Sequence, residues 1–132
     1  MSQSVSSGYA FNRTRRQFLA TRLTVAETHW SRFIGLIGKT AATFPQGRGL
    51  WIVPCRGVHT VGMRIPIDVV YLTENNVVLH LESGLRPWRF APIRIRAASV
   101  LELPEDTLRS TGTTIGDELE IDPHSSGEPQ PA

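Results

Sequence analysis

The sequence predicts a mainly β domain of the α+β class: a small, partly open antiparallel β-barrel of about seven short strands with one α-helix. Short runs of β-branched and other apolar residues recur along the chain and end at prolines, glycines or paired asparagines. These runs are not separated by regular helical patterns, which argues against a parallel βαβ sheet. A length of 132 residues suits one hydrophobic core.

The two ends of the chain differ in composition from its middle. Residues 1–8 are small and polar, and residues 123–132 contain three prolines, two serines and a glycine. Segments of this kind bury too little apolar surface to fold. We therefore expect disordered ends at residues 1–8 and 123–132 and a single β-rich domain at residues 9–122.

The N-terminal third is predicted to hold a strand followed by the helix. Phe18–Val25 alternates loosely and is rich in Leu, Thr and Val, which is typical of a strand. Thr28 can cap a helix near residues 28–38, because large apolar residues recur there at helical spacing and Gly38 can end it.

The rest of the chain reads as short strands. The clearest unit is a hairpin, in which Ile65–Leu72 and Val77–Glu82 are joined by a turn containing Asn75 and Asn76, residues that tolerate a positive φ. The other expected elements are strands at 49–53, 59–62, 98–103 and 117–121 and one helical turn at 106–110.

Charge is divided unevenly along the chain, although the net charge is only +2. Residues 1–96 hold 13 basic residues and four acids, whereas residues 97–132 hold one arginine and eight acids. The predicted strands of the acidic part must pack against the arginine-rich part. We therefore interpret the division as complementarity within one fold, with acids placed to neutralise arginines: Glu102, Asp117, Glu118 and Glu120.

Pro54–Asp68 is the densest segment for chemistry. It holds the only cysteine, Cys55, and His59 four residues later. A nearby imidazolium lowers a thiol pKa and can produce a thiolate nucleophile. Residues four apart in a strand lie about 13 Å apart, so the pair meets only if Gly57 permits a tight turn. The alternative is a half-buried core cysteine and a histidine bonded to the backbone.

Asp68 stands inside an apolar run. A carboxylate there is costly to bury unless it is paired or hydrogen-bonded. One alternative places Asp68 on the solvent face of a strand. The other makes it a buried partner of Arg64 or Arg48, or an anchor for the turn that contains Cys55.

Residues 86–96 interleave four arginines with Trp88 and Phe90. Guanidinium groups suit carboxylates and phosphates, and aromatic rings can stack on bases. The low net charge argues against nucleic acid as a partner. We expect a solvated loop or intramolecular pairing here.

Several classes of protein are excluded or disfavoured. No apolar stretch approaches the roughly 20 residues of a membrane-spanning helix. One cysteine excludes an intrachain disulfide framework, and the scattered histidines form no metal-ligand spacing, so we expect neither a metal nor another cofactor. Arg15-Arg16 matches a twin-arginine export motif, but Arg22 and Glu27 interrupt the apolar run such a signal needs. We expect a cytoplasmic protein.

Over most of its folded part the chain resembles domain of unknown function 192, a small bacterial and archaeal family. The resemblance rests on residues 12–15, 25–26, 32–38, 49–50, 59–72, 77–78, 100–103, 112 and 115–117. It implies a small β-rich domain with the Met-x-x-Pro-x-Asp element, Met63–Asp68, at its centre, and it implies no particular biochemical activity. Many members have a signal peptide and a Lys-Asn-Thr triplet. This chain has Gly62-Met63-Arg64 at the triplet's place.

The prediction that follows is a non-catalytic binding or accessory module with a small polar pocket near residues 55–68. Its partner would be a small anionic ligand or another protein. The pocket residues would be Cys55, His59, Arg64, Asp68, Arg48 and, at the rim, Trp88. A second hypothesis is a thiol-dependent hydrolase or transferase with Cys55 as nucleophile and His59 as base. A third is a nucleic-acid-binding module that uses residues 86–96.

Overall fold

The computed structural model describes residues 8–27 and 37–124. The helix expected near residues 28–38 lies almost wholly outside this part. The described elements, in chain order, are β1 (Gly8–Asn12), β2 (Gln17–Ala26), β3 (Arg48–Ile52), β4 (Ile67–Leu72), β5 (Val78–Leu85), β6 (Ser99–Pro104), α2 (Thr107–Thr111) and β7 (Leu119–Asp122).

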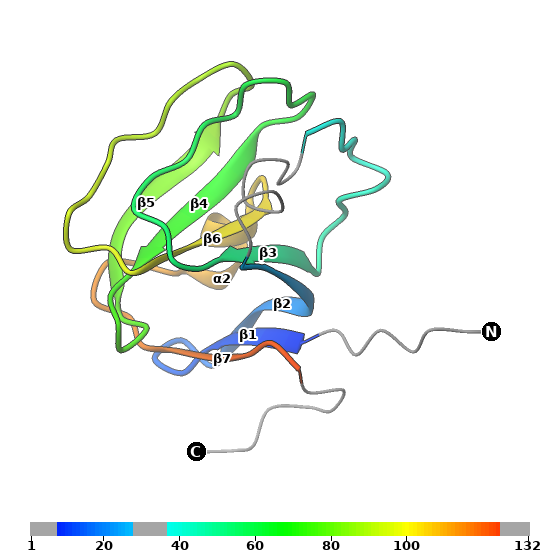
Figure 1. Ribbon diagram of the computed structural model, residues 1–132. Coiled ribbons are helices and arrows are strands. Elements are labelled where there is room, and N and C mark those ends of the chain that lie inside the picture. The colour runs from blue at the N-terminus through cyan, green and yellow to red at the C-terminus, as the bar shows by residue number, and fades with distance from the viewer. Residues whose placement is uncertain (1–7, 28–36, 125–132) are drawn as a thin grey trace.

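The seven strands form one sheet in the order β5-β4-β6-β3-β2-β1-β7, which curls into a half-barrel (Figure 1). Every neighbouring pair is antiparallel except β2 and β3, which run parallel. The predicted mainly β fold is confirmed, with one parallel pair inside it. The predicted hairpin is also confirmed, since β4 pairs with β5 and Asn76 takes a φ of 60° in the connecting turn.

Two details differ from the sequence-based expectation. The segment 59–62 is no strand and contributes one isolated bridge, between His59 and Phe90. In its place β1 completes the sheet, with β2 on one side and β7 on the other. Gly8–Asn12 shows no alternation of polar and apolar residues, because four of its five residues are buried.

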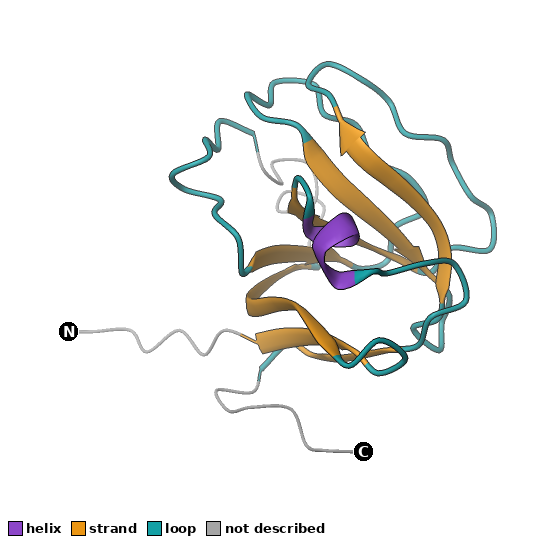
Figure 2. Ribbon diagram, turned by 180° about the vertical axis from the view of Figure 1, so that it is seen from behind, coloured by secondary structure: helices purple, strands orange, loops and turns teal. Residues whose placement is uncertain are grey.

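β4 and β6 are buried on both faces, so alternate residues enter two separate cores. Val69 and Tyr71 join a core that loops cover, which we call the loop-side core. Val70 and Leu72 join the inner core, which also holds Leu108 of α2. Figure 2 shows α2 between the two arms of the curled sheet. The helix therefore fills the open side of the half-barrel.

The two edge strands of the sheet, β5 and β7, approach each other at one end of the curl. The Val78 amide donates to the carbonyl of Asp117 at 2.8 Å, and the Leu119 amide donates to Asn76 at 2.9 Å. An isolated bridge joins Val77 to Glu118. These contacts close one end of the curl, as expected for a partly open barrel.

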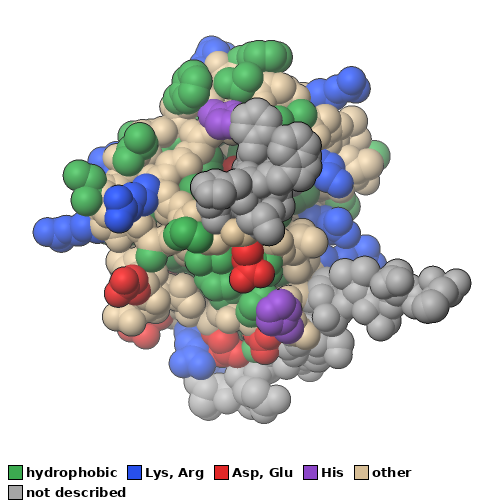
Figure 3. Space-filling model, viewed as in Figure 1, with side chains coloured by type: hydrophobic (Ala, Val, Ile, Leu, Met, Phe, Trp, Pro, Cys, Tyr) green, Lys and Arg blue, Asp and Glu red, His purple; other side chains and the backbone are tan. Residues whose placement is uncertain are grey.

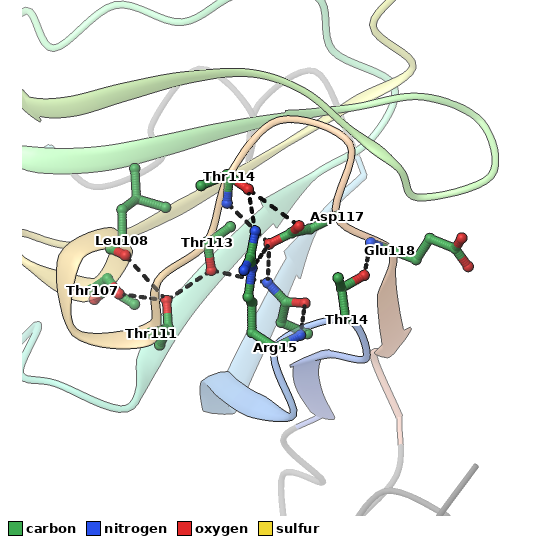
Figure 4. A network of polar contacts seen from close by, with 10 residues as sticks. Thr14, Arg15, Thr107, Leu108, Thr111, Thr113, Thr114, Asp117 and Glu118 are labelled. Atoms are coloured by element: carbon green, nitrogen blue, oxygen red, sulfur yellow. Dashed lines mark hydrogen bonds and ion pairs between the residues drawn. The ribbon is translucent and has the colours of Figure 1, made fainter.

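A polar network around Asp117 fixes the same end (Figure 4). Its Oδ2 accepts hydrogen bonds from Asn12 Nδ2, Arg15 Nε and the Thr114 amide, each at 3.0 Å. Arg13 pairs with Glu120 at 2.9 Å. The expected neutralisation of arginines by C-terminal acids is therefore confirmed for these two pairs. Arg15 belongs to the turn between β1 and β2, which is where the export-motif match falls.

We expect Asp117→Asn to destabilise the protein at neutral pH by about 1–3 kcal/mol, because buried donors lose a charged acceptor. Burial, the largest single influence, raises the pKa of Asp117, but hydrogen bonds from Asn12, Thr114 and Arg15 together hold it below its ordinary value of 3.8. Its contribution is therefore complete above pH 3.8 and is lost as the pH falls below it.

Urea unfolding of wild type and variant from pH 7 down to pH 3 tests this expectation. The two curves should converge at the acid end. A difference in stability that is constant over the whole range would contradict it. The exposed Glu118→Gln is the control, since the hydrogen bonds of Glu118 in the structure involve its backbone alone: its amide donates to Thr14 and its carbonyl accepts from the Arg13 amide.

Candidate functional site

Residues 53–66 and 86–98 form two loops that lie side by side along one edge of the molecule (Figure 1). We call them the loop pair. The Ala91 amide donates to Val58 at 2.9 Å and the Arg94 amide to Arg56 at 2.9 Å. These antiparallel backbone contacts make the two loops an irregular ribbon over the loop-side core.

Thr60 fastens the two loops together and is fully buried. Its amide donates to the Arg89 carbonyl at 2.8 Å, and its carbonyl accepts from the Trp88 amide at 2.9 Å. Its hydroxyl lies within hydrogen-bond distance of the Arg86 carbonyl and accepts from the Arg89 amide at 2.8 Å. Residues 86–90 therefore have a defined backbone path. Thr60 was not singled out from the sequence, because nothing in its neighbourhood marks a buried hydroxyl.

The inner side of the loop pair is held by small or flexible residues. Met63, Ala91 and Ala97 are buried in the loop-side core. The Tyr71 hydroxyl donates to the Pro92 carbonyl at 2.7 Å. Burial, followed by the nearby Glu82, raises the pKa of Tyr71 to about 12. Tyr71 is therefore a neutral donor at physiological pH and anchors the loop.

Two neighbouring cavities flank residues 93–98. The larger, of about 500 Å³, is lined by Pro54, Cys55, Arg56, Thr73, Glu74, Asn75, Ile95, Arg96, Ala97 and Ala98. The smaller, of about 350 Å³, is lined by Leu79, His80, Ile93, Arg94, Ile95 and Arg96. Ile95 and Arg96 belong to both, so the segment around them separates the two spaces.

Cys55 and His59 both lie in the loop pair, as the sequence suggested. The Cys55 thiol donates to the Gly57 carbonyl at 3.0 Å. Nδ1 of His59 accepts from the Val61 amide at 3.3 Å, and its ring centroid lies 6.2 Å from that of Phe90. In this geometry the Cys55 thiol acts as a hydrogen-bond donor and Nδ1 of His59 as an acceptor.

Asp68 lies on the other face of β4, toward the inner core, and is fully buried. Its Oδ1 accepts from the Gly84 amide at 2.9 Å and its Oδ2 from the Leu108 amide at 2.8 Å. The solvent-face alternative is therefore wrong. Backbone amides take the place of the arginine partners that the sequence suggested.

The remaining residues singled out from the sequence fall in two places. Arg64 and Trp88 are exposed on the loop pair. Arg48 begins β3 and pairs in register with Arg22 of β2. The structure thus places Cys55, His59, Arg64 and Trp88 in the loop pair and Asp68 and Arg48 outside it.

Sequence reasoning missed a titratable cluster under the loop pair. Nε2 of His80 lies 2.6 Å from Glu82 Oε2 and 3.3 Å from Nη2 of Arg94. The Tyr71 ring meets the His80 ring edge-on at 5.2 Å between centroids. The only signal in the sequence was the spacing of two between His80 and Glu82, which puts them on one face of a strand.

Glu102 is the buried acid on the loop-side face of β6. It stands beside Leu50 and Val69 in the sheet and is only 3% exposed. Burial raises its pKa to about 8. The expectation that it neutralises an arginine is wrong, since no ion pair between the described residues includes it.

The arginines of the loop pair remain solvated. Segments 53–67 and 83–101 contain no Asp or Glu. None of the four ion pairs found in residues 8–27 and 37–124 includes an arginine of these loops: Arg56, Arg64, Arg86, Arg89, Arg94 and Arg96. Internal charge complementarity therefore operates around β1 and β7 and does not extend to the loop pair.

Two further features concern the described part of the chain. None of its helices has the length and apolar character needed to cross a membrane. No three of its His, Cys, Asp and Glu side chains are grouped so that they could hold a metal ion.

Together, the curled seven-stranded sheet, the short helix and the arginine-rich loop pair define a small β-rich domain. Residues 10–121 match the DUF192 family, described as "Uncharacterized ACR". The chain belongs to this family, which confirms the resemblance found in the sequence.

Relatives and solved structures agree with this assignment. The chain is 28% identical over 127 residues to a UPF0127 protein of Thermococcus sibiricus, covering 91% of this chain and 80% of the relative. It is 28% identical over 114 residues to one of Pyrococcus furiosus, covering 83% and 94%.

Two crystal structures share the fold at 18% identity. One is a protein of unknown function from Novosphingobium aromaticivorans, with a TM-score of 0.75 and coverage of 86% of this chain and 83% of that one. The other is from Sinorhizobium meliloti and is described as a candidate transcription regulator, with a TM-score of 0.73 and coverage of 91% and 98%.

Proposed function

We propose that this domain is a non-catalytic binding module that takes a small anionic ligand in the larger cavity beside Cys55. One observation carries the proposal. The cavity is lined by Arg56 and Arg96, and neither guanidinium has an acidic partner among the described residues. Planar guanidinium groups bind carboxylates and phosphates in a bidentate manner.

The size and lining of the cavity support a small ligand. A volume of about 500 Å³ falls within the range of small-molecule sites. Its apolar lining residues are Pro54, Ile95, Ala97 and Ala98. Glu74 lines the same cavity and favours a ligand that carries a hydrogen-bond donor besides its anionic group.

The surroundings of Cys55 support a binding role over thiol chemistry. A nucleophilic cysteine needs its thiolate form. The Cys55 thiol instead donates a hydrogen bond to the Gly57 carbonyl, which favours the protonated form. Nδ1 of His59 is occupied by a backbone hydrogen bond from the Val61 amide and is directed at the main chain.

We expect inorganic phosphate or citrate to raise the melting temperature of the full chain and to bind measurably in calorimetry. Arg56→Ala and Arg96→Ala should each weaken that binding about tenfold or more, because each removes a charge-assisted hydrogen bond.

Arg89→Ala is the matched control for this experiment. It removes an exposed arginine from the same loop pair that does not line the cavity. Binding that is unchanged in Arg56→Ala and Arg96→Ala, or equally weakened in Arg89→Ala, would count against the site. Absence of any binding by both anions to the wild type would overturn the proposal.

A further inference from the structure

Residues 86–98 of the loop pair turn their largest apolar side chains outward. Trp88 is 63% exposed, Phe90 78%, Ile93 75% and Ile95 80%. The small Ala91 and Ala97 of the same segment are the ones that pack into the loop-side core. This arrangement is the reverse of what folding alone favours, because burying large apolar side chains contributes most to stability. An exposed group of this kind marks an interaction surface.

The outward side chains stand on a fixed backbone. Thr60 fastens residues 86–89, and the Tyr71 hydroxyl holds the Pro92 carbonyl. The Arg94 amide is bonded to Arg56 in the neighbouring loop. The apolar side chains are therefore presented in a defined arrangement, and part of the ordering cost of binding is already met by the fold.

Basic side chains alternate with the apolar ones. Arg86, Arg89, Arg94 and Arg96 lie on the same segment, and Arg56 and Arg64 on the adjoining loop. Figure 3 shows hydrophobic and basic side chains next to one another on the side of the molecule formed by the loop pair. With no acid in either loop segment, the surface suits a partner that is both apolar and negatively charged.

We propose that the loop pair docks this domain on the surface of an anionic lipid bilayer. Trp88 and Phe90 would enter the interface at the level of the headgroups, where aromatic rings are favoured. Ile93 and Ile95 would reach the boundary of the acyl chains, and the arginines would contact lipid phosphates. Single-stranded nucleic acid could stack on the two aromatic rings but offers no apolar environment for the two isoleucines. An anionic bilayer therefore offers a favourable environment to more of these side chains than single-stranded nucleic acid does.

Co-sedimentation of the full chain with vesicles tests the proposal. We expect binding to phosphatidylcholine vesicles that contain about one-third phosphatidylserine, much weaker binding to pure phosphatidylcholine, and a decrease with added salt. The double variants Trp88→Ser/Phe90→Ser and Ile93→Ser/Ile95→Ser should each lose about tenfold or more in affinity. Arg86→Gln/Arg89→Gln should also lose about tenfold or more in affinity, because each arginine contributes about fivefold.

Matched controls separate this surface from the rest of the chain. Ile115→Ser removes an apolar side chain that is also 63% exposed but lies outside the loop pair. Arg22→Gln removes an exposed arginine of β2. Both should bind vesicles as the wild type does. Trp88, Phe90, Arg86 and Arg89 do not line the larger cavity, whereas Ile95 does, so the aromatic and arginine variants are the ones that test this surface independently of the proposed ligand site.

Four results would overturn the proposal. The first is no binding to the anionic vesicles at low salt, and the second is equal loss in the control variants. The third is tight binding of a single-stranded oligonucleotide that depends on Trp88 and Phe90 but not on Ile93 and Ile95, with no vesicle binding. The fourth is a dimer of the wild type that Trp88→Ser/Phe90→Ser converts to a monomer, again with no vesicle binding.

Discussion

Glu102→Gln is expected to make the protein more stable than the wild type at pH 8, by about 4 kcal/mol. Glu102 is 3% exposed, and burial raises the pKa of its carboxyl group from 4.5 to about 8. A glutamine of the same shape has no proton to lose. The variant therefore avoids the cost of holding a carboxylate among Leu50, Val69 and the rest of the loop-side core.

The sign of the pH dependence follows from the raised pKa. Between pH 4.5 and pH 8 the folded wild type holds a proton on Glu102 that the unfolded chain has released. The stability of the wild type should therefore fall as the pH rises through this window and level off above it. Glu102→Gln should remove that slope and match the wild type near pH 4.

Urea unfolding at half-unit steps from pH 4 to pH 9 measures this difference. Glu118→Gln, at an exposed position, is the control and should follow the wild type to within about 0.5 kcal/mol. Parallel curves for wild type and Glu102→Gln over the whole window would refute the expectation. The pH dependence due to Asp117 lies below pH 3.8 and that due to Glu102 lies between pH 4.5 and pH 8, so the two effects fall in different ranges.

Asp68→Ala is expected to lower the free energy of unfolding by about 3–5 kcal/mol, the largest loss that we predict for a single polar group. Each oxygen of Asp68 accepts a backbone amide, that of Gly84 in β5 and that of Leu108 in α2. Alanine leaves both amides buried without an acceptor. Asp68→Asn retains one acceptor and turns an NH₂ group toward the other amide, so it should lose somewhat less.

Urea unfolding at neutral pH, with circular dichroism as the probe, tests this loss. Glu105→Ala removes an exposed acid that follows β6 and should leave stability almost unchanged. If Asp68→Ala were as stable as Glu105→Ala, Asp68 could not be the link between β4, β5 and α2. Hydrogen exchange at the amides of Gly84 and Leu108 would locate the loss, since both should exchange faster in the variant.

The sequence predicted the fold well where one face of a strand is apolar or where a turn has a marked composition. Pro54, Asn75-Asn76 and Pro104 correctly bounded three strands or turns. It failed at β1, because a short segment buried almost throughout carries no alternation. It also placed a strand at 59–62, where the extended backbone bonds irregularly to residues 88–91.

For the candidate site, local sequence located the loops but not the partners of their side chains. Cys55 and the arginines of residues 86–96 were found because they are rare or clustered. Thr60, Tyr71 and the pair of His80 and Glu82 were missed. Thr60, Tyr71 and His80 act through contacts with residues 86–94 of the second loop, for which one sequence gives no register.

The sequence by itself determined the composition of the two loops: six arginines, the aromatic residues Trp88 and Phe90, and no Asp or Glu. The sequence also determined that these two loops belong to a mainly β domain. Only the tertiary structure decided which acids meet which arginines. The curl of the sheet brings Asp117 and Glu120 to β1 and the turn after it and leaves Glu102 among apolar side chains. Charge pairing and burial depend on distance in space, and strands distant in the chain become neighbours only when the sheet closes.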